Sequence, residues 1–124
     1  MTYVFIALFA ILAAFARYGQ TVIVQAWAGR DFPWATLSIN VFGSFLMGYL
    51  FYATLASAMA PALRTGILIG GLGTYTTFST FSLETLNLIE EGESRKGLLY
   101  ITSSVGLSLI AVVLGAALSR SIGV

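Results

Sequence analysis

Two apolar segments of this 124-residue chain each carry a column of polar side chains at helical spacing. The columns consist of Thr36, Asn40 and Ser44 in one segment and of Tyr100, Ser104 and Ser108 in the other. Residues four apart lie on one face of a helix, so each set would stack along that face. Polar groups on an apolar helix mark a solute pathway, a contact between helices, or both. The plainer interpretation of Asn40 is a hydrogen bond between two helices, and that of the serines is bonding to their own helix.

A third segment, residues 70–82, reads GGLGTYTTFSTFS. Three glycines in four residues, followed by three threonines in four, disfavour a regular helix and predict a helix break. Non-helical backbone at membrane depth must line a cavity or coordinate something, and freed carbonyls suit a small cation. Phe78 and Phe81 are three residues apart and project from one face. Their plainer interpretation is packing against lipid or core.

The composition determines the solvent in which these segments fold. The chain is 58% hydrophobic and only 9% charged, with a mean hydropathy of +0.92. A soluble domain of this length has too little interior to bury so many apolar side chains. We therefore expect a single domain whose solvent is lipid.

The inventory of reactive groups argues against an enzyme. Cysteine and histidine are absent, which removes thiol nucleophiles, histidine bases and zinc sites. Only five acidic residues are present, and four of them lie between Glu84 and Glu93. The six basic residues are scattered and the net charge is +1, so no patch suited to nucleic acid exists.

Apolar runs predict four membrane-spanning helices, because crossing the hydrocarbon core takes about 20 apolar residues. The runs cover residues 3–28, 34–60, 62–89 and 98–118, within one transmembrane domain of residues 1–124. We therefore predict an all-α membrane protein with four transmembrane helices, the third of them broken. For the first run, a cleavable signal peptide ending near Ala16 is the alternative. The run lacks a basic leading region, and its apolar sequence continues past that point.

Basic residues are distributed almost evenly between the two predicted sides of the membrane. One side would receive Arg64 and Arg120, and the other Arg30, Arg95 and Lys96, with Arg17 nearer the second side. So small a bias predicts insertion in both orientations, with a single orientation as the alternative. Four helices that enclose no water-filled interior of their own also favour a closed oligomer, for which a two-fold dimer is the simplest symmetry.

Three stretches together resemble the signatures of the Fluc family of fluoride channels, also called CrcB. They are GLGTYTTFSTFSLE at residues 71–84, WATLSINVFGSFLMG at residues 34–48, and Arg-Tyr-Gly at residues 17–19. The resemblance covers nearly the whole chain, in the same order and with the same four-span layout. It implies an antiparallel, dual-topology homodimer in the cell inner (plasma) membrane. Such a dimer has two fluoride pores and a central sodium ion, and exports fluoride passively and electrogenically to give fluoride resistance.

The resemblance also implies roles for individual residues. It assigns the fluoride pathway to Arg17, Thr36, Asn40, Phe78, Ser79, Thr80, Phe81, Tyr100, Ser104 and Ser108, with Glu84 also at a motif position. Asn40 would donate a hydrogen bond to fluoride, and the ring edges of Phe78 and Phe81 would coordinate the ion from the partner subunit. The backbone carbonyls of Gly73 and Thr76 would hold the sodium ion.

These assignments agree with the chemistry of fluoride, which is small and strongly hydrated. A pore must replace its water with several donors, and amide N–H groups, hydroxyls and the positive edges of aromatic rings are suitable. A full positive charge in the pore would hold the ion too tightly for release.

Two other functions stay as alternatives. A small proton-coupled multidrug exporter would share the four-span, dual-topology design, but it needs a titratable carboxylate in its first span. No acidic residue precedes Asp31. A non-transporting membrane assembly subunit would explain the helix count, but neither the polar columns nor the broken helix.

The even charge distribution leads to a prediction about topology. A cysteine introduced near Arg64, in a chain that has no other cysteine, is expected to react with impermeant thiol reagents on both sides of the membrane. Labelling intact cells and inverted vesicles in parallel would measure the two populations. Strict labelling from one side would leave the single-orientation alternative.

Overall fold

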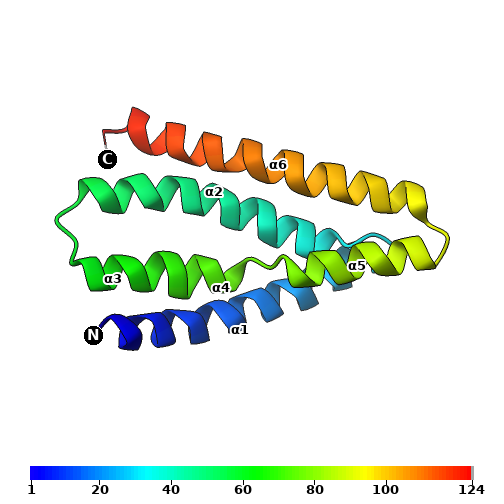
Figure 1. The fold of residues 1–124 in the computed structure, drawn as a ribbon, viewed down its shortest axis with the longest axis horizontal. Coiled ribbons are helices and arrows are strands. Elements are labelled where there is room, and N and C mark those ends of the chain that lie inside the picture. Colours follow the sequence, from blue (N-terminus) through cyan, green and yellow to red (C-terminus); the bar gives the residue numbers. More distant parts are fainter. Residues whose placement is uncertain (124) are drawn as a thin grey trace.

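The computed structural model describes residues 1–123, and every regular element in that range is a helix. The elements are α1 (Thr2–Ala28), α2 (Trp34–Ala56), α3 (Pro61–Thr65), η1 (Gly66–Leu72), α4 (Gly73–Tyr75), α5 (Ser79–Glu90) and α6 (Ser94–Ser121). In Figure 1 they form four rows, and α3, η1, α4 and α5 follow one another along a single row. The predicted all-helical class is confirmed.

Three of the helices, α1, α2 and α6, are long and apolar enough to cross a membrane. The third row consists of shorter pieces, so no one helix in it reaches that length. Large apolar side chains cover the outside of the molecule, and the ring of Trp27, for example, is 90% exposed. A surface of this kind is suited to contact with lipid or with another apolar protein surface.

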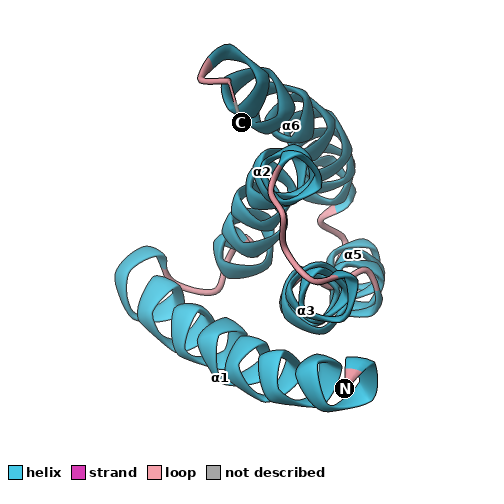
Figure 2. Ribbon diagram, turned by 90° about the vertical axis from the view of Figure 1, so that its left-hand side faces the viewer, coloured by secondary structure: helices cyan, strands magenta, loops and turns pink. Residues whose placement is uncertain are grey.

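Helices α2 and α6 pack with their backbones in contact. A Cβ atom on Gly48 would overlap the carbonyl of Val112, and one on Gly115 would overlap the carbonyl of Phe45. Small residues permit this close approach, which supplies van der Waals contact where no hydrophobic driving force acts between helices. Figure 2 shows α6 lying along α2, with α1 crossing on the far side of the third row.

The third row packs on α1 through a wide helical turn. Residues 66–72 form a π-helix, and the buried glycines Gly66 and Gly70 lie against the backbone of Phe5 and Ile6 in α1. Any side chain at these two positions would push the two elements apart. Gly66 and Gly70 therefore serve close packing, whereas a Cβ on Gly71 or Gly73 would make only ordinary contacts.

The regular helix ends after the glycines, at Thr76. Gly73 is itself helical, with φ −63° and ψ −30°, whereas Thr76 is extended, with φ −77° and ψ 159°. Helix α5 then begins at Ser79. The sequence predicts a break within residues 70–82, across the glycines and the threonines that follow them. The helix continues through the glycines and ends among the threonines, at Thr76.

Candidate functional site

The side chain of Asn40, in α2, binds the backbone of the third row at Thr77, just after the helix ends; this pair of bonds is here called the clamp. Its Nδ2 donates to the carbonyl of Thr77 at 2.9 Å, and its Oδ1 accepts from the amide of Thr77 at 2.8 Å. In a continuous helix that amide would bond to the carbonyl of Gly73. One side chain thus satisfies both backbone groups of Thr77, and one N–H of its amide remains for another acceptor.

Helix α1 holds the other side of the same segment. Arg17 donates from Nη1 to the carbonyl of Thr76 at 3.4 Å, and the hydroxyl of Tyr75 donates to Oε1 of Gln20. Gln20 in turn donates from Nε2 to Oγ of Ser38 at 3.1 Å, which connects α1 to α2. Gln20 and Ser38 were not among the residues predicted from the sequence. A signal was present, because Gln20 lies three residues after Arg17 on one face of an apolar helix.

The hydroxyls of Thr77 and Thr80 organise the start of α5. Oγ1 of Thr77 lies 3.0 Å from Oγ1 of Thr80 and accepts a hydrogen bond from the Thr80 amide at 3.2 Å. This bond satisfies one of the amides that a helix start leaves unpaired. Ser79 is exposed at the first position of α5 and lines none of the polar spaces described below.

A groove of about 300 Å³, here called the serine groove, opens beside this segment. It is lined by Asn40, Ser44, Thr76, Thr77, Phe78, Phe81, Ser104, Val105, Ser108 and Leu109. Two members of each polar column therefore line one space: Asn40 and Ser44 from α2, and Ser104 and Ser108 from α6. The buried hydroxyl of Ser104 has no hydrogen-bond partner within residues 1–123, although a buried hydroxyl is normally paired.

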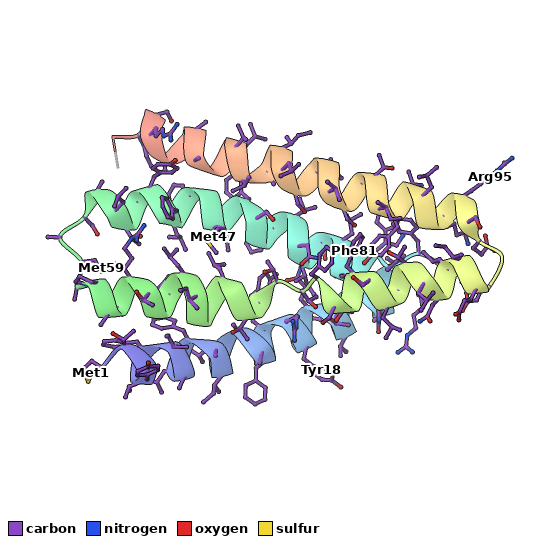
Figure 3. All side chains as sticks on the ribbon, viewed as in Figure 1. Met1, Tyr18, Met47, Met59, Phe81 and Arg95 are labelled. Atoms are coloured by element: carbon purple, nitrogen blue, oxygen red, sulfur yellow. The ribbon has the colours of Figure 1, made fainter. Side chains whose placement is uncertain are left out.

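The two phenylalanines at the groove have different environments. The ring of Phe78 is 77% exposed, whereas that of Phe81 is 8% exposed and packs on Tyr100 with 5.1 Å between ring centroids. The two phenylalanine centroids are 5.4 Å apart and the planes are inclined by 54°. In Figure 3 Phe81 lies near the middle of the molecule, where α4 gives way to α5. Phe81 is thus held in place by contacts within its own chain, whereas the side chain of Phe78 is left exposed.

A second polar space, here called the arginine chamber, lies between α1, α2 and α5 and measures about 270 Å³. Its lining comprises Ala14, Arg17, Tyr18, Thr21, Gln25, Thr36, Ile39, Thr77, Thr80 and Glu84. Thr77 also lines the serine groove. The structure therefore brings Arg17, Thr36 and Thr80 together in a space that adjoins the groove at the clamped backbone.

Tyr100 does not line the serine groove, unlike Ser104 and Ser108, the other members of its column. It is completely buried, and its hydroxyl donates to Oε1 of Glu84 at 2.9 Å. It lines neither the serine groove nor the arginine chamber. Its ring packs against Phe81, and its hydroxyl orients the carboxylate of Glu84, which lines the chamber.

Beyond Glu84 the chamber adjoins a mouth of about 340 Å³ at the end of the molecule. The mouth shares Gln25 and Glu84 with the chamber and carries charges of both signs, namely Arg30, Asp31, Glu84, Glu91, Glu93 and Lys96. Mouth, chamber and groove thus form a series of polar spaces in which each shares lining residues with the next.

A metal ion at this site would have to be bound by carbonyls. No cluster of three or more acidic residues within the described part of the chain could hold one. Thr76 directs its carbonyl to Arg17, and the Thr77 amide bonds to Asn40 instead of to the carbonyl of Gly73. One chain offers at most these two carbonyls, and the residues fit such an ion only if a second copy supplies further ligands.

The chain matches a family model over most of its length. The model is described as CrcB-like protein, Camphor Resistance (CrcB), and it matches residues 4–116. The chain belongs to the CrcB family. The interruption, the serine groove and the arginine chamber all lie inside the matched range, and the CrcB chain is accordingly a membrane protein.

Relatives of this CrcB protein carry the name "Fluoride-specific ion channel FluC". One from Acidithiobacillus ferrooxidans is 64% identical over 97% of this chain and 97% of its own length. One from Magnetococcus marinus is 50% identical over 98% of this chain and all of its own. One from Thermus thermophilus is 42% identical over 91% of this chain and 90% of its own.

The clamp predicts that Asn40 contributes to stability as well as to the site. Asn40→Leu removes both bonds to Thr77 and leaves its amide and carbonyl unpaired, which costs about 1–3 kcal/mol per group. The free energy of unfolding in mixed detergent micelles should therefore fall by at least about 1 kcal/mol. Ser44→Ala, one helical turn along the same face, is the control and should leave it almost unchanged. Equal effects of the two substitutions would contradict the clamp.

Proposed function

We propose that this CrcB-family protein is a fluoride-selective ion channel that exports fluoride passively across the cell inner membrane. The observation that carries the proposal is the unpaired hydroxyl of Ser104, buried in a groove of neutral donors. A desolvated anion would give that hydroxyl an acceptor. The name of the relatives supports fluoride as the ion.

The polar spaces suggest an order of contacts for the ion. It would enter at the mouth, where four carboxylates outnumber two basic side chains and give an anion no net attraction, and reach the hydroxyls of Thr77 and Thr80 in the chamber. It would then pass to the serine groove and meet the remaining N–H of Asn40 and the hydroxyl of Ser104. Fluoride needs several short donors to replace its water, and neutral ones release it again.

Arg17 would contribute attraction without trapping the ion. Its guanidinium lines the chamber and is engaged with the carbonyl of Thr76, so part of its charge is already compensated. A cation at the entrance raises the local concentration of an anion, whereas one inside the groove would bind it too firmly. Residues 1–123 place no basic side chain among those that line the serine groove.

The channel would work as an antiparallel homodimer. Phe78 projects from the chain beside a groove that is open along one side, which leaves both to be covered by a second copy. The positive ring edges of Phe78 and Phe81 would then face fluoride bound in the partner's groove. The third transmembrane helix, broken at residues 76–78, would cross its counterpart at the centre of the dimer.

A sodium ion would be bound at that crossing by the carbonyls of Gly73 and Thr76 from each copy. When bound, it would supply a fixed positive charge that offsets the mutual repulsion of four carbonyl dipoles. Arg17 lies against the same Thr76 carbonyl and would hold it from the other side. The chain's own clamp at Asn40 keeps the extended backbone ready for this geometry.

The phenylalanines provide the first test of the pathway. Phe78→Ile keeps an apolar side chain but removes the positive ring edge, so fluoride flux through liposomes should fall by orders of magnitude while the dimer still assembles. Phe81→Ile should do the same with some added loss of packing on Tyr100. Phe15→Ile, at a ring that is 74% exposed on α1, is the control and should conduct normally. Normal flux through Phe78→Ile would mean that this ring only packs.

Passive flow predicts how transport responds to voltage. The chain has no histidine, α1 has no carboxylate, and Glu84, the carboxylate of the chamber, accepts a hydrogen bond from Tyr100. Each fluoride should therefore cross with its charge. Efflux from proteoliposomes should stall without a potassium ionophore, begin when valinomycin is added, and reverse with the imposed potential. Chloride should pass poorly because it is larger and regains less of its dehydration energy from small, rigid donors.

Protein-free liposomes and the Asn40→Leu variant serve as controls for leak in this experiment. Uphill movement of fluoride driven by a proton gradient at zero voltage would overturn the channel mechanism. It would instead favour a coupled transporter built on the same fold.

A further inference from the structure

One end of the molecule carries arginines without acidic partners. Arg64 begins the third row and Arg120 ends α6, and in Figure 1 these elements meet at the end that holds both termini. The acidic residues lie on the α1–α2 connection, on α5 or just after it: Asp31, Glu84, Glu90, Glu91 and Glu93. The positive charge at the arginine end is therefore not neutralised by any carboxylate side chain of residues 1–123.

An aromatic pair at the end of α2 orients both arginines. The guanidinium of Arg64 lies 4.7 Å from the ring centroid of Phe51, and that of Arg120 lies 4.1 Å from the ring centroid of Tyr52. The two rings contact each other edge to face, with 5.1 Å between centroids. Stacking of this kind fixes a guanidinium by its face and leaves its N–H edges available.

The two arginines differ in how many of their donors are used. Arg64 donates from Nε to Oγ1 of Thr54 at 3.0 Å and from Nη2 to the carbonyl of Phe51 at 3.1 Å. Arg120 is exposed, and its guanidinium lies over the face of Tyr52. Arg120 therefore has donors suited to a planar or tetrahedral anion.

Arg120 lies at the end of an apolar groove between α2 and α6. This α2–α6 groove has a volume of about 480 Å³. Its lining comprises Met47, Gly48, Phe51, Tyr52, Val112, Val113, Ala116, Ala117 and Arg120. All of its other residues are apolar or aromatic, so the groove combines an apolar trough with a cation at one end.

We propose that the α2–α6 groove is a binding site for an anionic phospholipid, with an acyl chain along the groove and the phosphate on Arg120. A basic residue between membrane helices near the interface suits an acidic headgroup, and an apolar trough suits a single chain. An antiparallel copy would bring its acid-rich end toward Arg120, so a second copy is the competing occupant. The trough favours an acyl chain, because all of its lining except Arg120 is apolar or aromatic, and the exposed N–H edges of Arg120 suit the phosphate joined to that chain. The proposal does not depend on the ion that the protein conducts.

Native mass spectrometry of the delipidated protein can test this site directly. The probes are phosphatidylglycerol and phosphatidylcholine with identical acyl chains, which differ in headgroup charge alone. We expect the wild-type protein to bind phosphatidylglycerol more tightly, and Arg120→Gln to weaken that binding by roughly fivefold to tenfold while leaving phosphatidylcholine unaffected. Equal affinity of the wild-type protein for the two lipids, or an unchanged preference in Arg120→Gln, would overturn the proposal.

Matched variants separate the headgroup contact from the trough. Arg95→Gln removes an exposed arginine at the opposite end of the molecule, visible in Figure 3, and should leave the preference intact. Arg120→Lys keeps the charge and should retain the preference even if Arg120→Gln folds poorly. Ala117→Phe fills the trough and should weaken both lipids equally. If Ala117→Phe changes neither affinity, no acyl chain lies in the groove.

A second copy in the groove is the competing outcome, and a cysteine can detect it. Ala117→Cys would be the only cysteine in the chain. We expect it to remain reactive toward a lipid-soluble thiol reagent and to form no crosslink between copies in the membrane. Efficient oxidative crosslinking at this position would assign the groove to a protein interface and would refute the lipid site.

Discussion

The constraint on which the site depends is that backbone polar groups inside a membrane must find partners within the protein. A helix that ends at Tyr75 and restarts at Ser79 frees amides and carbonyls where neither water nor a helix turn can pair them. The neighbouring helices provide those partners. Asn40 reaches from α2 to both groups of Thr77, and Arg17 reaches from α1 to the carbonyl of Thr76. The positions of α1 and α2 follow from that need as much as from apolar packing.

The same groups that satisfy the backbone also form the lining of the polar spaces. Asn40 uses one N–H on Thr77 and presents its other toward the serine groove, while Thr77 lines the groove and the chamber. The donors of Asn40 and Thr77 are held rigidly, because each side chain makes a bond that the fold requires. Rigid neutral donors favour a small anion over a large one, since they cannot spread to fit the larger ion. Stability and selectivity therefore have a common origin here.

The sequence predicted the helices and their polar columns well, because the lengths of apolar runs and a spacing of four residues are local properties. The resemblance assigned Asn40 and Ser104 to one pathway, and both line the serine groove. The predicted break spanned glycines and threonines, and spacing alone could not show that the helix continues through the glycines, where Gly70 packs on Ile6, and ends at Thr76. Nor could spacing reveal that Tyr100 turns to Glu84, since that bond depends on how α5 packs against α6.

A single chain leaves its serine groove open beside the exposed ring of Phe78, and lipid cannot pair the polar groups of that groove. The proposed antiparallel copy, related to the first by a two-fold axis, would cover both. Each residue close to such an axis lies close to the same residue of the second copy. The carbonyls of Gly73 and Thr76 would then meet their counterparts, so like dipoles would converge at the centre. Arg17 can offset that repulsion only from outside, because its guanidinium approaches Thr76 from α1. The small cation proposed above would balance those carbonyls from the axis itself.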